Sequence, residues 1–166
     1  YDLFRKYFGE QDQEHSNGNI LFKGVSTPQY DSTIGIVGGR ERKELVEYLD
    51  NVSEEFKTIF LHHNVVPIPH SREKGLLEDA GDFLRDMVDA KVDLVLTGTS
   101  SHPYATKVGD TVVVNANSIS SAYQRSLRGN SFNLIDIYDG AISVSEINSL
   151  WGKRHLLGIW ERNGHI

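Results

Sequence analysis

Two neighbouring histidines follow a compact apolar run, and their imidazoles are the side chains in this sequence best suited to chemistry. The run covers residues 58–61, and His62 and His63 come directly after it. Such a run is typical of a buried strand, and open α/β sheets place their sites at the carboxyl ends of strands. An imidazole there can bind a divalent metal. The structural alternative is that one ring hydrogen-bonds a backbone carbonyl while the other faces solvent.

A second polar cluster follows the apolar segment 92–97. Gly98 permits a tight turn there, and Thr99, Ser101 and His102 come after it. The two hydroxyls are candidate contacts to a substrate phosphate, and the imidazole of His102 is a candidate contact to a metal. Alternatively, the hydroxyls satisfy turn amides and His102 is exposed.

Asn115 lies in a third loop of small polar residues, directly after the apolar residues 112–114. A loop of this kind can approach a ligand closely, which makes Asn115 a candidate substrate contact. It can also form a turn that is hydrogen-bonded to itself.

The spacing of apolar residues predicts the elements that must position these side chains. We expect helices over residues 1–8, 40–51 and 76–90. We expect strands at 20–25, 58–61, 92–97, 112–114, 134–137 and 142–147, with two-residue hairpin turns within 108–111 and 138–141. This order predicts one layered α/β domain over 1–150, and residues 151–166, which show no clear period, are predicted to be a C-terminal tail.

Composition narrows the function classes. The chain has 166 residues, 17 Lys and Arg against 23 Asp and Glu, and no cysteine. The net charge of −6 argues against a dedicated nucleic-acid-binding surface, and the lack of cysteine excludes disulfides, thiolate zinc sites and a cysteine nucleophile. No apolar run approaches a membrane span, and residues 1–6 lack the pattern of a signal peptide. We therefore expect a cytoplasmic protein.

Taken in order, these segments resemble the calcineurin-like metallophosphoesterases, in particular the cyclic-nucleotide-phosphodiesterase-like or exonuclease-like branch. The family has Leu-His-His at a strand end, as at residues 61–63, and then a helix similar to 77–82. Its Asp-Leu-Val-Leu-x-Gly-His-x-His-x-Pro-Tyr segment corresponds to 93–104, and a Val-Asn-Ala-x-Ser-like loop corresponds to 114–118. The resemblance covers most of residues 1–147.

The resemblance implies a two-sheet β-sandwich flanked by helices, with a dinuclear site for Mn, Fe, Zn or Co at its edge. A metal-bound hydroxide in such a site hydrolyses a phosphodiester or a phosphomonoester. His62 matches a metal-ligand position of the family, and His63 is its neighbour in the outer shell.

Two departures from the family pattern bear on activity. The family's Asp-x-His, Gly-Asp and Gly-Asn-His-Asp motifs precede the position of Tyr1, and none occurs in this sequence. Thr99 and Ser101 replace the two histidines of Gly-His-x-His, and His102 lies one place out of register, so that it could serve as a ligand only if the loop shifts.

We therefore expect the chain to be the C-terminal half of such a domain and to be inactive alone. Its exposed sheet faces and edges would need a complementary N-terminal half or a homo-oligomer. A non-catalytic metallophosphoesterase-like protein with an assembly or binding role is the main alternative. An unrelated α/β domain is the third.

Overall fold

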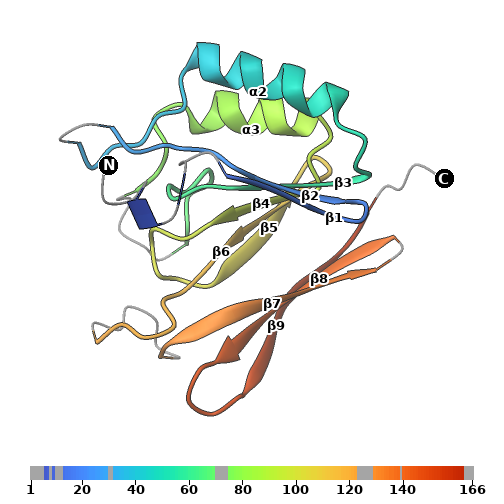
Figure 1. Ribbon diagram of the computed structural model, residues 1–166. Coiled ribbons are helices and arrows are strands. Elements are labelled where there is room, and N and C mark those ends of the chain that lie inside the picture. Colours follow the sequence, from blue (N-terminus) through green and yellow to red (C-terminus); the bar gives the residue numbers. More distant parts are fainter. Residues whose placement is uncertain are drawn as a thin grey trace.

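The structure has three layers: two helices, a large mixed sheet and a small antiparallel sheet (Figure 1). It is a computed structural model that describes residues 6–7, 9, 13–29, 32–69, 75–122, 129–138 and 140–162. This confirms the predicted α/β class with two sheets and flanking helices.

The large sheet has the strand order β1-β2-β3-β4-β6-β5. Its strands are β1 (Glu14–Asn17), β2 (Ile20–Gly24), β3 (Phe56–Phe60), β4 (Leu94–Thr97), β5 (Tyr104–Val108) and β6 (Thr111–Asn115). Strands β2, β3, β4 and β6 run parallel, whereas β1 and β5 are antiparallel edge strands. The carboxyl ends of the four parallel strands therefore lie at one edge of the sheet.

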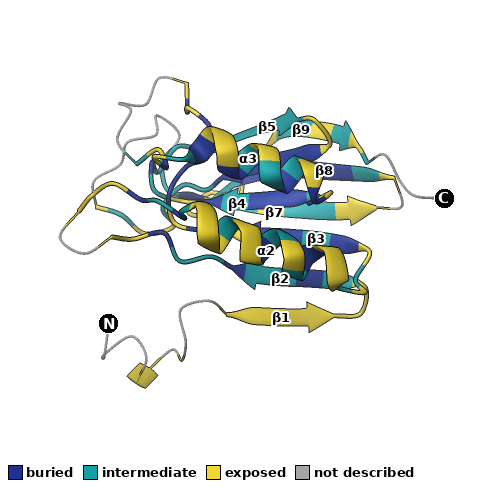
Figure 2. Ribbon diagram, turned by 90° about the horizontal axis from the view of Figure 1, so that it is seen from above, coloured by how far each residue is buried: buried dark blue, intermediate teal, exposed yellow. Residues whose placement is uncertain are grey.

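Two helices, α2 (Gly39–Asn51) and α3 (Ala80–Asp89), cover one face of this sheet (Figures 1 and 2). Leu45 and Leu49 of α2, and Phe83 and Met87 of α3, lie four residues apart, so each pair projects from one side of its helix. These residues form the first core with side chains from the four parallel strands, namely Leu21, Ile59, Val95 and Val113.

The small sheet covers part of the opposite face. It has the order β7-β8-β9, with β7 (Ser131–Tyr138), β8 (Ala141–Asn148) and β9 (Arg154–Glu161). Ile142 and Val144 of β8 form a second core with Phe56, Leu94, Val112 and Val114 of the large sheet. Because successive side chains of a strand point to opposite faces, β6 contributes to both cores and is buried along its whole length.

Most predicted elements are confirmed, with differences at four places. The helix predicted from residue 76 begins at Ala80, because Leu76 instead forms a β-bridge with Asn64. Strands β1 and β5 were not predicted, and β9 lies within the segment predicted as a tail, where it pairs with β8. The helix predicted over 1–8 lies largely outside the described residues. None of the described helices is long and apolar enough to cross a membrane.

A partly buried ion-pair cluster joins the start of α2 to α3. The Asp79 carboxylate accepts hydrogen bonds from the backbone N–H groups of Val37 and Gly38, at 3.1 and 2.9 Å, and it pairs with Arg42. Arg42 also donates to Asp86 at 2.9 Å. Burial alone would raise the pKa of Asp79, but these N–H donors and Arg42 outweigh it and lower that pKa. The loop before α2 is therefore fixed to the start of α3.

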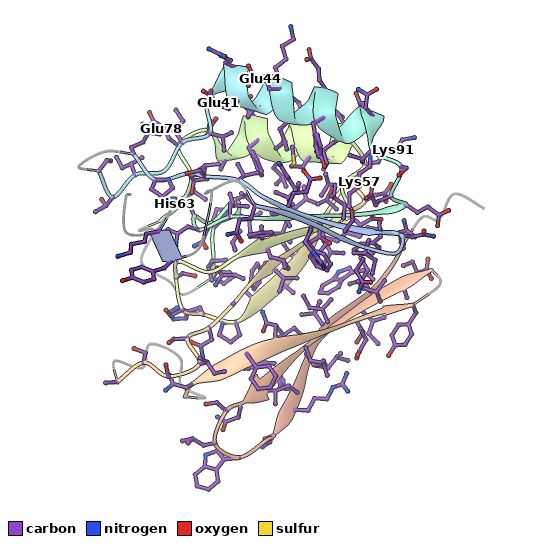
Figure 3. The ribbon with its side chains drawn as sticks, in the orientation of Figure 1. Glu41, Glu44, Lys57, His63, Glu78 and Lys91 are labelled. Carbon is purple, nitrogen blue, oxygen red and sulfur yellow. The ribbon has the colours of Figure 1, made fainter. Side chains whose placement is uncertain are left out.

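The other ends of both helices share one cation. Lys57 of β3 lies beneath them (Figure 3), and its ammonium donates to the carbonyls of Leu49 at 2.7 Å and Ala90 at 3.2 Å. A positive charge at a helix C-terminus satisfies unpaired carbonyls and opposes the helix dipole. One side chain thus holds both helices on the sheet.

We predict that Lys57→Met lowers the free energy of unfolding by about 1–3 kcal/mol, because both helix ends lose a charged donor. Urea denaturation followed by circular dichroism measures this. Lys43→Met is the matched control, since Lys43 is exposed on α2 and its ammonium forms only a long, exposed ion pair with Glu47, at 3.8 Å. Equal effects of the two substitutions would contradict the role given to Lys57.

Candidate functional site

The three polar clusters predicted from the sequence lie at the carboxyl edge of the parallel strands. His62 and His63 follow β3, residues 98–102 follow β4, and Asn115 ends β6. Since β3 pairs with β4 and β4 with β6, the clusters are neighbours in space. The topology confirms their expected position at a strand end.

His62 and Thr99 come together across two adjacent strand ends. His62 is exposed, and its Nε2 lies 2.6 Å from the Thr99 hydroxyl oxygen. The backbone reinforces this pairing, because the Gly98 N–H donates to the His62 carbonyl at 3.3 Å. Gly75 packs on the other side of Thr99, where a Cβ atom would lie 1.9 Å from the Thr99 methyl carbon. The contact therefore depends on a glycine at position 75.

His63 is buried and holds the loop before α2. Its Nδ1 lies 2.7 Å from the Thr27 hydroxyl, and a Cβ at Gly35 would overlap its ring at 2.2 Å. Burial, reinforced by charge on His62, lowers the pKa of His63 and outweighs a hydrogen bond with the Thr33 backbone. The ring is therefore neutral near pH 7. Figure 3 shows it below Glu78, whose N–H donates to the Gly35 carbonyl at 2.8 Å.

The structure places one imidazole in the interior and one at the surface. His63 is buried against Thr27, and His62 is exposed beside Thr99. The rings of His62 and His63 meet edge to face, with centroids 4.8 Å apart. This contact places His63 behind the exposed ring of His62.

Asn115 organises the loop after β4. It is fully buried, and its amide donates to the Ser100 hydroxyl at 2.8 Å and to the His102 carbonyl at 2.6 Å. Its Oδ1 accepts from Thr97 at 3.0 Å. The predicted contact of Asn115 with a substrate does not fit this geometry, because both ends of the amide are bonded inside the protein. Asn115 is a positioning residue for the loop.

Ser101 and His102 lie in the turn that Asn115 holds. Ser101 has a φ of +52°, a left-handed conformation that a serine adopts at a cost of about 1–2 kcal/mol. His102 is half-buried, and its Nδ1 lies 2.8 Å from the Ser100 carbonyl. The imidazole is thus bonded to its own turn, whereas His62 is bonded to Thr99.

The donor set near His62 does not fit a dinuclear metal site. Among the described residues, no group of three His, Asp or Glu side chains is placed to hold a metal ion. The exposed imidazole has the hydroxyl of Thr99 as its neighbour, whereas Mn, Fe, Zn and Co favour imidazole and carboxylate ligands. The described part of the chain therefore provides one ligand of the family type, and further ligands would have to come from elsewhere.

An open groove of about 490 Å³ runs beside His62 on the face opposite the helices. Its floor is a row of residues paired across three strands, Gly24, Phe60 and Leu96. Pro28 and Gly98 add to its lining. The groove is mainly apolar, so it suits the non-reacting part of a ligand or a packed side chain. Sequence patterns did not indicate the groove, because its lining comes from three separate segments, 24–28, 60–62 and 96–98.

Comparisons with known proteins support the fold and no more. No family model and no curated protein matches the sequence. Among solved structures, GAP50, the anchor in the inner membrane complex of Plasmodium, matches with a TM-score of 0.61 and 15% identity over 91% of this chain and 54% of that chain. The chain thus spans about half the length of GAP50.

Two further solved structures match with low TM-scores. Entamoeba histolytica Vps29 complexed with Zn²⁺ has a TM-score of 0.38 and 15% identity, covering 86% of this chain and 98% of that chain. A predicted phosphoesterase from Streptococcus pneumoniae has a TM-score of 0.41 and 13% identity, covering 85% and 97%. The similarity to GAP50 supports the two-sheet α/β fold of this chain, and the two lower-scoring matches add nothing to it.

We predict that acid destabilises the protein through His63. Its pKa is lowered in the folded state, so below the unfolded value of about 6.5 the unfolded chain binds the proton first and stability falls. We expect His63→Gln to lower the free energy of unfolding by about 2 kcal/mol at pH 8, because the side chain that contacts Thr27 is replaced. The variant should also lose less stability than the unmodified protein when the pH falls from 7 to 5.

Urea midpoints measured across this pH range test the effect. His15→Gln, at an exposed position on β1, is the control. It should lose as much stability between pH 7 and pH 5 as the unmodified protein. An undiminished loss in His63→Gln would show that another group is responsible.

Proposed function

We propose that this chain is one half of a metallophosphoesterase-type hydrolase of phosphodiesters or phosphomonoesters. A second polypeptide would supply the remaining metal ligands. The observation that carries the proposal is the exposed imidazole of His62 at the end of β3, next to Thr99 from the loop after β4. The resemblance of residues 61–63 and 93–104 to the family's motifs supports it.

The chain's own residues would have limited roles in such a site. His62 presents the imidazole, and Thr99 orients it through the 2.6 Å contact. Asn115 keeps the loop that carries Thr99 and Ser101 in place. The groove at Phe60 and Leu96 would receive the apolar part of an ester. Because the described donor set does not fit the metals, hydrolysis by the chain alone is not expected.

A non-catalytic role in assembly is the second candidate. It is favoured by Thr99, whose hydroxyl occupies the Nε2 side of His62, where a metal would otherwise bind. GAP50 is described as an anchor in a membrane complex, and a scaffolding role of that kind would need no metal in this chain.

Restoring the missing imidazoles distinguishes the two candidates. We predict that Thr99→His combined with Ser101→His raises the bound Zn²⁺ or Mn²⁺ to about one equivalent, because His62 then gains imidazole neighbours. Elemental analysis after dialysis measures the metal content. Adding His62→Ala to this variant should return the content to that of the unmodified chain.

The unmodified chain should show no hydrolysis of bis-p-nitrophenyl phosphate above buffer containing Mn²⁺. If the restored variant binds no more metal than the unmodified chain, the edge at His62 is not a metal-site scaffold and the assembly role is favoured.

A further inference from the structure

The turn between β8 and β9 presents two large apolar side chains to solvent. Leu150 is 73% exposed and Trp151 is 82% exposed, which are the two highest values among the exposed large hydrophobic residues of the described chain. Figure 1 shows this turn at the end of the small sheet, away from both helices. Single exposed apolar residues are common on protein surfaces, but an adjacent pair at a projecting turn indicates a contact surface.

Hydrogen bonds hold this turn in one conformation. The side-chain oxygen of Asn148 accepts from the N–H groups of Leu150 at 3.0 Å and Trp151 at 2.9 Å. The Asn148 N–H donates to the Lys153 carbonyl at 2.9 Å, and the Asn148 carbonyl accepts from the Gly152 N–H at 3.0 Å. Because the backbone is fixed in this way, the turn presents Leu150 and Trp151 outward without a large ordering cost on binding.

The segment that contains the turn is basic, although the whole chain has a net charge of −6. Residues 147–160 include no acidic residue, and Lys153, Arg154 and His155 lie within this range. Arg154 pairs with Asp136 at 2.9 Å, whereas Lys153 and His155 are exposed and line one open cavity of about 410 Å³ together with Trp151. The exposed indole and two basic side chains therefore face the same space.

This combination favours a bilayer over a protein as the partner. Leu150 and Trp151 together expose on the order of 300 Å², so a protein pocket around them would bury on the order of 600 Å² in total. That is below the roughly 1,200 Å² of a stable protein interface. Tryptophan is enriched at the membrane–water interface, and anionic lipids attract neighbouring Lys and Arg side chains.

The turn lies at the same end of the molecule as the candidate site. The Ser149 N–H donates to the Asn130 carbonyl at 2.9 Å, which joins the turn to the start of β7. Asn117, two residues after the end of β6, donates to the Ser131 hydroxyl at 2.9 Å. The start of β7 is thus held between the turn and the carboxyl edge of the parallel strands, the edge that carries His62.

We infer that the β8–β9 turn is a peripheral membrane contact, which inserts Leu150 and Trp151 into the surface of a bilayer that contains anionic lipids. Lys153 lies among the headgroups in this arrangement, because its long stem lets the ammonium stay in the polar layer. The contact needs no membrane-crossing segment and does not depend on the proposed function. It orients the molecule so that the edge with His62 is at the membrane side.

The test sediments the full chain with vesicles made of equal parts phosphatidylglycerol and phosphatidylcholine, or of phosphatidylcholine alone, at low salt. We expect the partition coefficient to be at least about fivefold higher for the anionic vesicles and to fall at high salt, because ions screen the attraction. Leu150→Ser combined with Trp151→Ser should lower it at least about tenfold. Lys153→Gln should lower it about fivefold, because one cation near the surface is lost.

Two matched controls carry equivalent changes away from the turn. Tyr138→Ser removes an exposed aromatic ring at the opposite end of the small sheet, and Lys43→Gln removes an exposed cation on α2. Both should partition as the unmodified chain does. Circular dichroism verifies that every variant is folded.

Fluorescence reports whether the indole enters the bilayer. The chain has two tryptophans, so Trp160→Phe leaves Trp151 as the one emitting indole. Its emission should shift to shorter wavelength with anionic vesicles and be quenched by lipids brominated on their tails. Equal binding to both vesicle types, no binding, or binding that the double serine variant retains would overturn the inference. Binding without a change in Trp151 emission would also overturn it, since charge alone would then hold the chain.

Discussion

Parallel pairing of β2, β3, β4 and β6 is the constraint on which the candidate site depends. It brings four carboxyl ends to one edge, so that His62 and Thr99, 37 residues apart, come within 2.6 Å. Parallel strands must be buried on both faces. In β6 this requirement is met by Val113 toward the helices and Val112 and Val114 toward the small sheet. Both cores are therefore needed to hold the edge.

The loops at this edge are held by buried polar groups whose hydrogen bonds are made within the chain. Thr27 bonds His63, and Asn115 bonds the turn after β4. A buried polar group left unpaired costs about 1–3 kcal/mol, so these contacts favour one loop arrangement over others. Among the described residues of these loops, the exposed ring of His62, with Thr99 beside it, remains available to a ligand.

Sequence patterns alone determined the α/β class, both helices, the hairpin turns and the strand end that carries His62. These follow from local apolar spacing and turn residues, which report which side of an element is buried. Tertiary structure decided the rest. Strand β9 was hidden because a bulge beside Val144 and Ser145 breaks its alternation and both of its faces are apolar. The roles of His63 and Asn115 depend on partners 36 and 15 residues away. No local pattern encodes such partners, because a side chain's contacts are set by how the whole chain packs.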